Sequence, residues 1–390
     1  MSKKWLLLIS TIVAVSLFAV LAAGCGGGAK TDSAEIKIGG DFEVTGGVAN
    51  FGKSTMNGIQ LAFKDVNAKG GVLGKKIVLV VADNKSEPSE AANAITKLIT
   101  QDKVVTVLGP VASSNVLAAS QIATDNKIPL LTATATASKV TVGDDGKVKD
   151  YIFRACFIDP FQGEVMANFA AKSLKVKTAA IYVDNASDYS KGLAQVFEDK
   201  FVKNGGKIVA SEAFLAKDTD FKSALTKIKA ANPDVIFIPA YYQEVGLIVK
   251  QARELGITCP MIGTDGWDSP KVVEIAGAAA LNNTYFSNHY SPEDKDPNVS
   301  NFVEAYKKEY GQVPDALAAL GYDAALMLID AIKRANSAEP AKIKDALAQT
   351  KNLQVSTGIL TLDASHNPIK SAVVIEMKDG KQTFKEKINP

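Results

Sequence analysis

The residues best placed for chemistry lie in loops that follow short apolar runs rich in valine, isoleucine and leucine. Ser113 follows the run at residues 104–108, and Thr134 and Thr136 follow the run at residues 128–131. Hydroxyls and free backbone N–H groups at the start of a helix can bind a carboxylate. Each segment alone is also consistent with a helix cap or a solvated polar loop. The sequence therefore marks a candidate anion site and leaves that alternative open.

A carboxylate and aromatic rings follow two other apolar runs. Tyr241 follows the run at residues 235–239, and Asp265 and Trp267 follow the run at residues 261–263. An aspartate can pair with an ammonium, and tyrosine or tryptophan can bound an apolar pocket while keeping a polar handle. Surface aromatics and a turn aspartate would look the same. Combined with the hydroxyls above, the set suits a free α-amino acid, which carries a carboxylate and an ammonium.

These loops contain no nucleophile with an adjacent base. The two histidines, His289 and His366, lie outside the loops and have no cysteine or carboxylate neighbours at ligand spacing. A serine nucleophile needs a base beside it, and a zinc site needs clustered ligands. We therefore predict no enzymatic activity, no metal site and no cofactor.

One motif points to a different chemistry. Residues 47–54 read GVANFGKS, which matches the P-loop pattern, and the run at residues 77–82 followed by Asp83 imitates the strand that positions magnesium in P-loop enzymes. The stretch at residues 39–47 is long for a loop that should leave its strand directly, and no further nucleotide signature follows. A P-loop NTPase is kept as an alternative.

Short apolar runs alternate with amphipathic segments along most of the chain. Such runs are typical of buried parallel strands, and strict alternation predicts sheets covered by helices on both faces. Ligands then bind at the carboxyl ends of the strands. Strands are expected over residues 36–39, 77–82, 104–108, 128–131, 179–183, 207–210, 235–239, 261–263, 358–362 and 372–377, the last leading into a hairpin turn at Asp379-Gly380. Helices are expected over residues 56–68, 88–100, 116–124, 162–174, 191–204, 221–231, 244–255, 301–310, 316–335 and 341–349.

Composition limits the possible partners. The chain has 390 residues, of which 47% are hydrophobic, enough for two domains with their own cores. Loss of the first 24 residues would remove two of the 44 basic side chains and leave 42 basic and 42 acidic ones. This neutral balance predicts no nucleic-acid partner. Cys156 and Cys259 remain, and the sequence leaves open whether they pair.

The N-terminus has the pattern of a secretory signal. A basic pair, Lys3-Lys4, precedes an apolar stretch that ends in small residues before Cys25. A cysteine at that position looks like the modification site of a bacterial lipoprotein, with residues 1–24 removed, Cys25 acylated and residues 25–35 forming a flexible tether. An uncleaved membrane anchor is the alternative. In both cases the chain works outside the cytoplasm at the cell membrane, away from cytosolic ATP and NAD.

Several motifs together indicate a family. The most specific is NAKGG at residues 67–71, followed by LGK at residues 73–75. Others are IKIG at 36–39, TGG at 45–47, GPVASS at 109–114, YSKGLA at 189–194 and GTDGW at 263–267. With these motifs the chain resembles the extracytoplasmic substrate-binding proteins of ABC transporters, in the branched-chain amino acid (leucine/isoleucine/valine) binding family. The P-loop-like motif falls in the first ligand loop of that family, which accounts for it without a nucleotide.

The resemblance implies a type I periplasmic binding protein fold. This is an α/β fold with two doubly wound parallel-sheet lobes joined by a three-segment hinge, and the ligand is clamped between the lobes. We expect residues 36–156 and 285–365 in the first lobe, and residues 157–284 and 366–390 in the second.

The resemblance also assigns roles to the polar residues. Ser113 would bind the ligand carboxylate, and Thr136 would bridge the carboxylate and the ammonium. Thr134 would offer its backbone carbonyl to the ammonium, and Asp265 its carboxylate. Familiar members carry glutamate where Asp265 stands, a longer reach to the ammonium, so the choice of amino acid stays open.

Aromatic residues complete the implied site. Phe51 would line the side-chain pocket, Tyr189 and Tyr241 would close over the ligand, and Trp267 would add a wall. The resulting hypothesis is a lipid-anchored solute-binding protein that captures an aliphatic amino acid and delivers it to an ABC transporter permease. The alternatives are a ligand without an ammonium, such as an amide, urea or aromatic acid, and a sensor module that signals to a partner.

Overall fold

The computed structural model describes residues 35–389. The predicted signal sequence (residues 1–24), the predicted lipidation site Cys25 and nearly all of the predicted tether (residues 25–35) lie outside the described residues. Within the described part, no helix is both long enough and apolar enough to cross a membrane.

The first of two large sheets has five strands in the order β2-β1-β3-β4-β5. β1 pairs in parallel with β3, β3 with β4, and β4 with β5. A helix follows each of the first three strands along the chain, as the alternating sequence predicts. The strands are β1 (Glu35–Phe42), β2 (Lys76–Asp83), β3 (Thr106–Leu108), β4 (Leu130–Thr132) and β5 (Ile152–Arg154), and the helices are α2 (Ala49–Ala68), α3 (Pro88–Thr100) and α4 (Ser113–Asp125), with a short helix η1 (Ser138–Val140) after β4.

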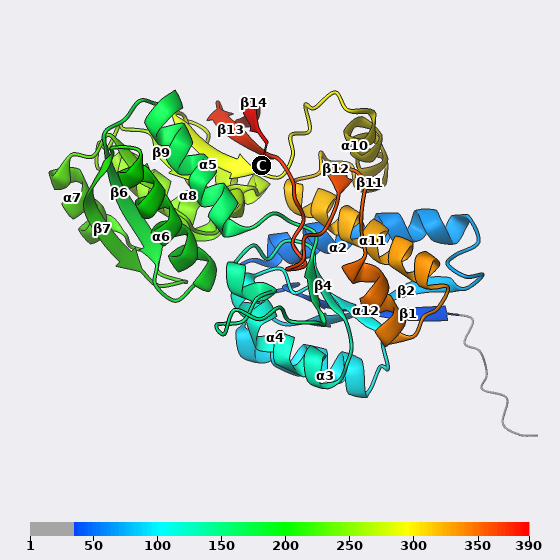
Figure 1. The fold of residues 1–390 in the computed structure, drawn as a ribbon. Coiled ribbons are helices and arrows are strands. Elements are labelled where there is room, and N and C mark those ends of the chain that lie inside the picture. Colours follow the sequence, from blue (N-terminus) through cyan, green and yellow to red (C-terminus); the bar gives the residue numbers. More distant parts are fainter. Residues whose placement is uncertain (1–34, 390) are drawn as a thin grey trace, which may run out of the picture. The chain divides into compact units, whose positions relative to one another are not determined.

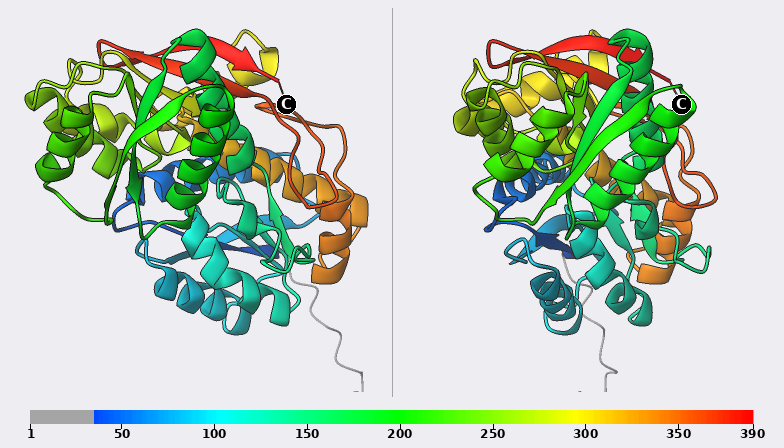
Figure 2. Two further views of the ribbon diagram at one scale, coloured as in Figure 1. Left: turned by 60° about the vertical axis from the view of Figure 1, so that its left-hand side comes forward. Right: turned by 90° about the vertical axis from the view of Figure 1, so that its left-hand side faces the viewer.

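The second sheet has seven strands in the order β14-β13-β10-β9-β8-β6-β7. Its five strands from β10 to β7 pair in parallel, whereas β13 and β14 add an antiparallel hairpin at one edge. Figure 2 shows this hairpin in red along the green and yellow elements. The strands are β6 (Thr178–Asp184), β7 (Lys207–Phe214), β8 (Val235–Phe237), β9 (Met261–Gly263), β10 (Thr284–Asn288), β13 (Ala372–Lys378) and β14 (Lys381–Ile388). The helices are α5 (Asp159–Asn168) with its extension η2 (Phe169–Ser173), α6 (Asp188–Lys203), α7 (Lys222–Ala231), α8 (Tyr242–Glu254), η3 (Asp265–Trp267) and α9 (Pro270–Ala276).

Three later helices return to the first sheet. α11 (Ala316–Ala335) packs along α2, and α12 (Pro340–Ala348) packs against α11, while α10 (Pro297–Tyr310) contacts α2. Figure 1 shows the orange α11 beside the blue α2. The core of this region joins the buried face of α11 to the apolar residues of the first sheet. A small two-stranded sheet of β11 (Leu353–Val355) and β12 (Gly358–Leu360) follows α12.

The chain passes between the two sheets three times, after β5, after β10 and after β12. The lobe boundary expected at residue 285 falls inside β10, which belongs to the second sheet, so this passage comes after Asn288. The strand escaped prediction because its five buried residues, TYFSN, include three polar ones and form no apolar run. β5, with three residues, was missed as well.

The P-loop-like motif is part of a helix. α2 begins at Ala49, earlier than the expected residue 56, so most of residues 47–54 is helical and cannot form a phosphate-binding loop. Gly52 packs directly on the preceding loop, because a Cβ at this position would lie 2.2 Å from the carbonyl oxygen of Glu43. The glycine thus serves close packing of helix and strand end.

Candidate functional site

The hydroxyls predicted from the first sheet lie together at the ends of β3 and β4. Ser113 opens α4, and its Oγ accepts a hydrogen bond from the Ala137 backbone N–H at 3.2 Å. Its own proton is therefore available to another acceptor. Thr134 donates its hydroxyl to the Val111 carbonyl at 3.0 Å. Together with Thr136, these side chains are buried, so a group bound here would be shielded from water.

A carboxylate that the sequence analysis did not single out shapes this loop. Glu43, which follows β1, is fully buried and accepts the backbone N–H groups of Val111 and Ala112, each at 3.0 Å. It also accepts the Asn115 amide at 2.8 Å. Burial raises the pKa of Glu43. These bonds fix the turn before α4. Glu43 was missed because it lies four residues beyond the apolar run expected at residues 36–39, in a segment that also carries Asp41.

The second sheet contributes a carboxylate at the end of β9. Asp265 Oδ1 accepts hydrogen bonds from the Tyr189 hydroxyl at 2.7 Å and from Gln162 Nε2 at 3.1 Å. His289 Nε2 lies 2.9 Å from Asp265 Oδ2. Burial lowers the pKa of His289, which favours the neutral ring. The sequence analysis missed Gln162, which is 103 residues from Asp265 along the chain, and placed His289, 24 residues away, outside the site.

These two groups of side chains face one cavity. It contains about 280 Å³ of space, partly open to solvent, and has polar groups together with an apolar wall. Tyr189 and Tyr241 stack with ring centroids 4.9 Å apart, and Phe51 meets the Tyr241 ring edge-on at 5.8 Å. The cavity is lined by Phe51, Val111, Ala112, Ser113, Thr134, Thr136, Tyr189, Tyr241, Asp265, Gly266 and Leu317. Seven of the eight predicted ligand-binding residues are among them.

A family model described as Periplasmic binding protein matches residues 35–382. This chain belongs to the periplasmic binding protein family. A Leu/Ile/Val-binding protein of Rhizobium johnstonii is 33% identical to it over 356 residues, which are 91% of this chain and 92% of that protein. The family membership expected from the sequence motifs is thereby confirmed.

Solved structures of the family are similar over nearly the whole chain. A leucine-binding protein of Thermotoga maritima superposes with a TM-score of 0.86 at 41% identity, covering 91% of this chain and 99% of that one. A branched-chain amino acid transporter substrate-binding protein of Streptococcus pneumoniae, in complex with isoleucine, gives a TM-score of 0.86 at 40% identity, covering 91% and 100%. The prediction of an α/β fold built on parallel sheets is confirmed, and the periplasmic binding protein family consists of extracytoplasmic solute-binding proteins, not enzymes.

Trp267 lies apart from the other predicted site residues. Its indole is fully buried, donates from Nε1 to the Ile238 carbonyl at 2.9 Å and stacks toward Phe286. Gly263 makes room for it, because a Cβ there would lie 2.0 Å from the indole nitrogen. Trp267 thus supports the Asp265 loop from within the core and does not line the cavity, contrary to its expected role as a wall.

The cysteines and possible metal ligands of the described residues form neither a metal site nor a disulfide. Among residues 35–389, no group of three or more His, Cys, Asp and Glu side chains could hold a metal ion. Cys156 and Cys259, whose pairing the sequence left open, are both free thiols. Burial raises the pKa of Cys156 to about 12, which keeps it as an inert thiol.

Proposed function

We propose that this protein captures a free aliphatic α-amino acid in the cavity and delivers it to an ABC transporter permease. The observation that carries the proposal is the single cavity in which Ser113, Thr136 and Asp265 meet beside an apolar wall. A zwitterion needs opposite partners at its two ends, because a buried charge without a partner is costly.

Each end of the ligand would find its partner. The carboxylate would accept the Ser113 hydroxyl and the backbone N–H groups of Ser113 and Ser114 at the start of α4, whereas those of Asn115 and Val116 donate to the Ala112 carbonyl. The ammonium would donate to Asp265, whose orientation is fixed by three hydrogen-bond donors. Thr136 lines the same cavity. This arrangement would select α-amino acids over ligands that lack either charge.

The apolar part of the cavity would receive the side chain. Phe51, Leu317 and Val111 provide apolar surface, and Tyr241 covers it. Burial of apolar surface favours binding by about 25 cal/mol per Å². An aliphatic side chain suits this wall, which offers no charged partner for a basic or acidic one. The similar proteins from Rhizobium johnstonii and Streptococcus pneumoniae support the same ligand class.

Ligand binding would hold the two sheets and their helices together as two closing lobes. Direct contacts across the cleft include the Asn50 N–H donating to the Tyr242 hydroxyl at 3.3 Å, the Ser114 hydroxyl meeting Asp188 at 3.3 Å, and the Phe51 ring packing against Tyr241. An exposed ion pair also joins Lys217 to Glu87 at 2.5 Å. Exposed ion pairs contribute little. Ligand contacts from both sheets would add to these direct contacts and favour the closed state.

Isothermal titration calorimetry with the common amino acids tests the proposal. We expect binding of leucine, isoleucine or valine, and none of lysine or glutamate at the same concentrations. Binding of an amide, urea or aromatic acid with no amino acid binding would favour the alternative ligand class. A sensor role would require a protein partner other than a permease, which cross-linking in the native membrane would identify.

The lipid anchor forms part of the same proposal. It rests on Cys25 following a secretory signal pattern. Labelling of growing cells with radioactive fatty acid should mark the wild-type chain and leave Cys25→Ala unlabelled. Equal absence of label in both chains would reject the anchor while leaving ligand binding untouched.

A further inference from the structure

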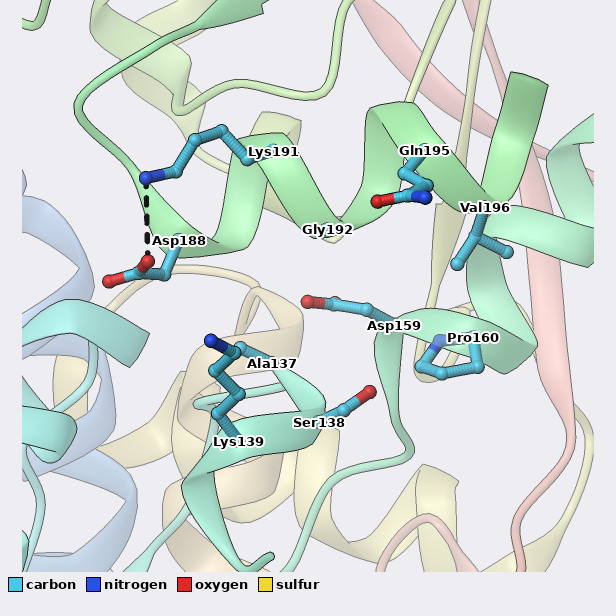
Figure 3. A pocket seen from close by; sticks show the side chains of 10 residues that line it. All are labelled: Ala137, Ser138, Lys139, Asp159, Pro160, Asp188, Lys191, Gly192, Gln195 and Val196. Carbon is cyan, nitrogen blue, oxygen red and sulfur yellow. Dashed lines mark ion pairs between the residues drawn. The ribbon is translucent and has the colours of Figure 1, made fainter. Parts of the chain in front are cut away.

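A second cavity lies on the far side of the ligand-cavity wall. It contains about 730 Å³ of space, partly open to solvent, and shares no lining residue with the ligand cavity. Figure 3 shows it between the start of α5, helix α6 and the η1 turn. Thr136 lines the first cavity and Asp159 the second, and the Asp159 backbone N–H donates to the Thr136 carbonyl at 2.9 Å. These two residues therefore lie between the two cavities.

Asp159 is buried, but one of its two carboxylate oxygens has no hydrogen-bond partner among the described residues. Its residue exposure is 2%, and no described residue forms a hydrogen bond with its Oδ2. Figure 3 shows the carboxylate directed into the second cavity, toward the facing α6. The two lysines that line this cavity form ion pairs with other acids. Lys139 Nζ lies 2.8 Å from Asp144 Oδ1, and Lys191 Nζ lies 3.5 Å from Asp188 Oδ1. Neither lysine is an ion-pair partner of Asp159.

Gln162 connects Asp159 to the ligand cavity. Its Nε2 donates to Asp159 Oδ1 at 2.9 Å and to Asp265 Oδ1 at 3.1 Å. Its Oε1 accepts the Ser287 hydroxyl at 3.0 Å, which fixes the amide with its nitrogen toward the two carboxylates. One amide thus bridges two acids, and one of these acids faces the expected ammonium.

We propose that Asp159 is a second, positioning carboxylate of the ligand site, and that its loss of a proton through the second cavity strengthens ligand binding. This inference rests on the proposed function, because it concerns the ammonium of the same ligand. Asp159 does not line the ligand cavity and would act through its neighbours Thr136 and Gln162. An ionised Asp159 would accept a hydrogen bond from the Thr136 hydroxyl. The lone pairs of the Thr136 oxygen would then be available to the ligand ammonium.

The charges around Asp159 set the pH range of the effect. Burial raises the pKa of Asp159 to about 7; hydrogen bonding by Thr136 opposes this, and the negative charge of Asp265 adds to it. Gln162 and the Arg154 guanidinium on β5 also favour the ionised form. The groups facing it across the second cavity are Lys139 on η1 and Asp188 and Lys191 on α6, and burial lowers the pKa of His289 beside Asp265.

Ligand binding and the loss of the Asp159 proton are thermodynamically linked, and this linkage gives the direction of the pH dependence. A ligand ammonium favours the ionised carboxylate, so the pKa of Asp159 falls on binding and a proton is released. Affinity should therefore increase as the pH rises through about 7 and decrease below it. For one proton the change cannot exceed about tenfold per pH unit.

Calorimetry with leucine in two buffers of different ionisation enthalpy measures this proton directly. Near pH 7 the wild-type chain should release a fraction of one proton, and its affinity at pH 5.5 should be at least about threefold weaker than at pH 8. Asp159→Asn should release none and lose the pH dependence. Asp188→Asn, which changes an acid of the same cavity that has no bond to Gln162, should keep the wild-type proton release.

The outcomes separate the two proposals. Heat of binding without proton exchange in the wild-type chain, or unchanged exchange in Asp159→Asn, overturns this inference and leaves the proposed function standing. No heat with any amino acid overturns both. If Asp159→Asn does not fold, the wild-type chain still decides, because ligand binding at pH 6 should remove the carbonyl stretch of a protonated carboxyl group from its infrared spectrum. An unchanged band would contradict the inference.

Discussion

The first sheet contributes a hydroxyl end to the ligand cavity, formed by Ser113 and Thr136, whereas the second sheet contributes a carboxylate end, formed by Asp265. The first end is held by backbone bonds to a buried glutamate, Glu43, which keeps the turn before α4 in place. The second end is held by side chains from three separate elements, which donate to Asp265. Both ends are buried, but they match a ligand charge in different ways.

The difference reflects how a fold can supply each sign of charge. Positive potential is available from a helix N-terminus and from hydroxyls, so many small dipoles can share the binding of a carboxylate. Negative potential for a buried ammonium comes here from one carboxylate, which must itself be hydrogen-bonded to stay charged in the protein interior. The hydroxyl end should therefore tolerate the loss of one group better than the carboxylate end.

The largest expected effect is at Asp265. Asp265→Ala would leave the ligand ammonium buried without a counter-charge, and loss of one partner of a buried charge pair costs about 2–5 kcal/mol. A cost of about 3 kcal/mol corresponds to a roughly hundredfold weaker affinity for leucine by calorimetry.

Asp188→Asn serves as the control for this prediction, because Asp188 lies outside the ligand cavity and its carboxylate meets the Ser114 hydroxyl at 3.3 Å. Its affinity should stay close to that of the wild-type chain. If Asp265→Ala binds within about threefold of wild type, the ligand makes no charge pair here and belongs to a class without an ammonium.

The same contrast explains how much could be predicted from the sequence. The loops after β3, β4 and β9 were identified because buried parallel strands are short apolar runs, and their carboxyl ends meet at one edge of a sheet. Ser113, Thr136 and Asp265 follow such runs directly. Position in a repeating pattern marked them as candidates, and the family resemblance assigned their roles.

The residues that hold Asp265 could not be found in this way. Gln162 is 103 residues from Asp265 along the chain, and His289 lies at the end of β10, whose polar composition hid the strand. Their contact depends on the order of strands in the second sheet, which local pattern does not specify. Trp267 was predicted to line the cavity because it lies in a loop after a strand. Its ring instead packs in the core, where Gly263 leaves room for it.

A smaller effect is expected at the hydroxyl end. Ser113→Ala removes one donor to the ligand carboxylate but leaves the N–H groups of the α4 N-terminus, and a hydrogen bond to a charged group contributes about 1.5–3 kcal/mol. We expect the lower end of that range, a roughly tenfold weaker affinity for leucine. Ser114→Ala is the matched control, since its hydroxyl meets Asp188 outside the cavity.

The Ser113 hydroxyl also accepts the Ala137 N–H, so thermal melting of the ligand-free variants must separate the two roles. A loss of affinity with little change in melting temperature would assign Ser113 to the ligand. A lower melting temperature with unchanged affinity would assign it to the turn alone. If Ser113→Ala weakens leucine binding as much as Asp265→Ala does, the ligand carboxylate also depends on a single protein group. The contrast between many shared dipoles and one fixed charge would then no longer hold.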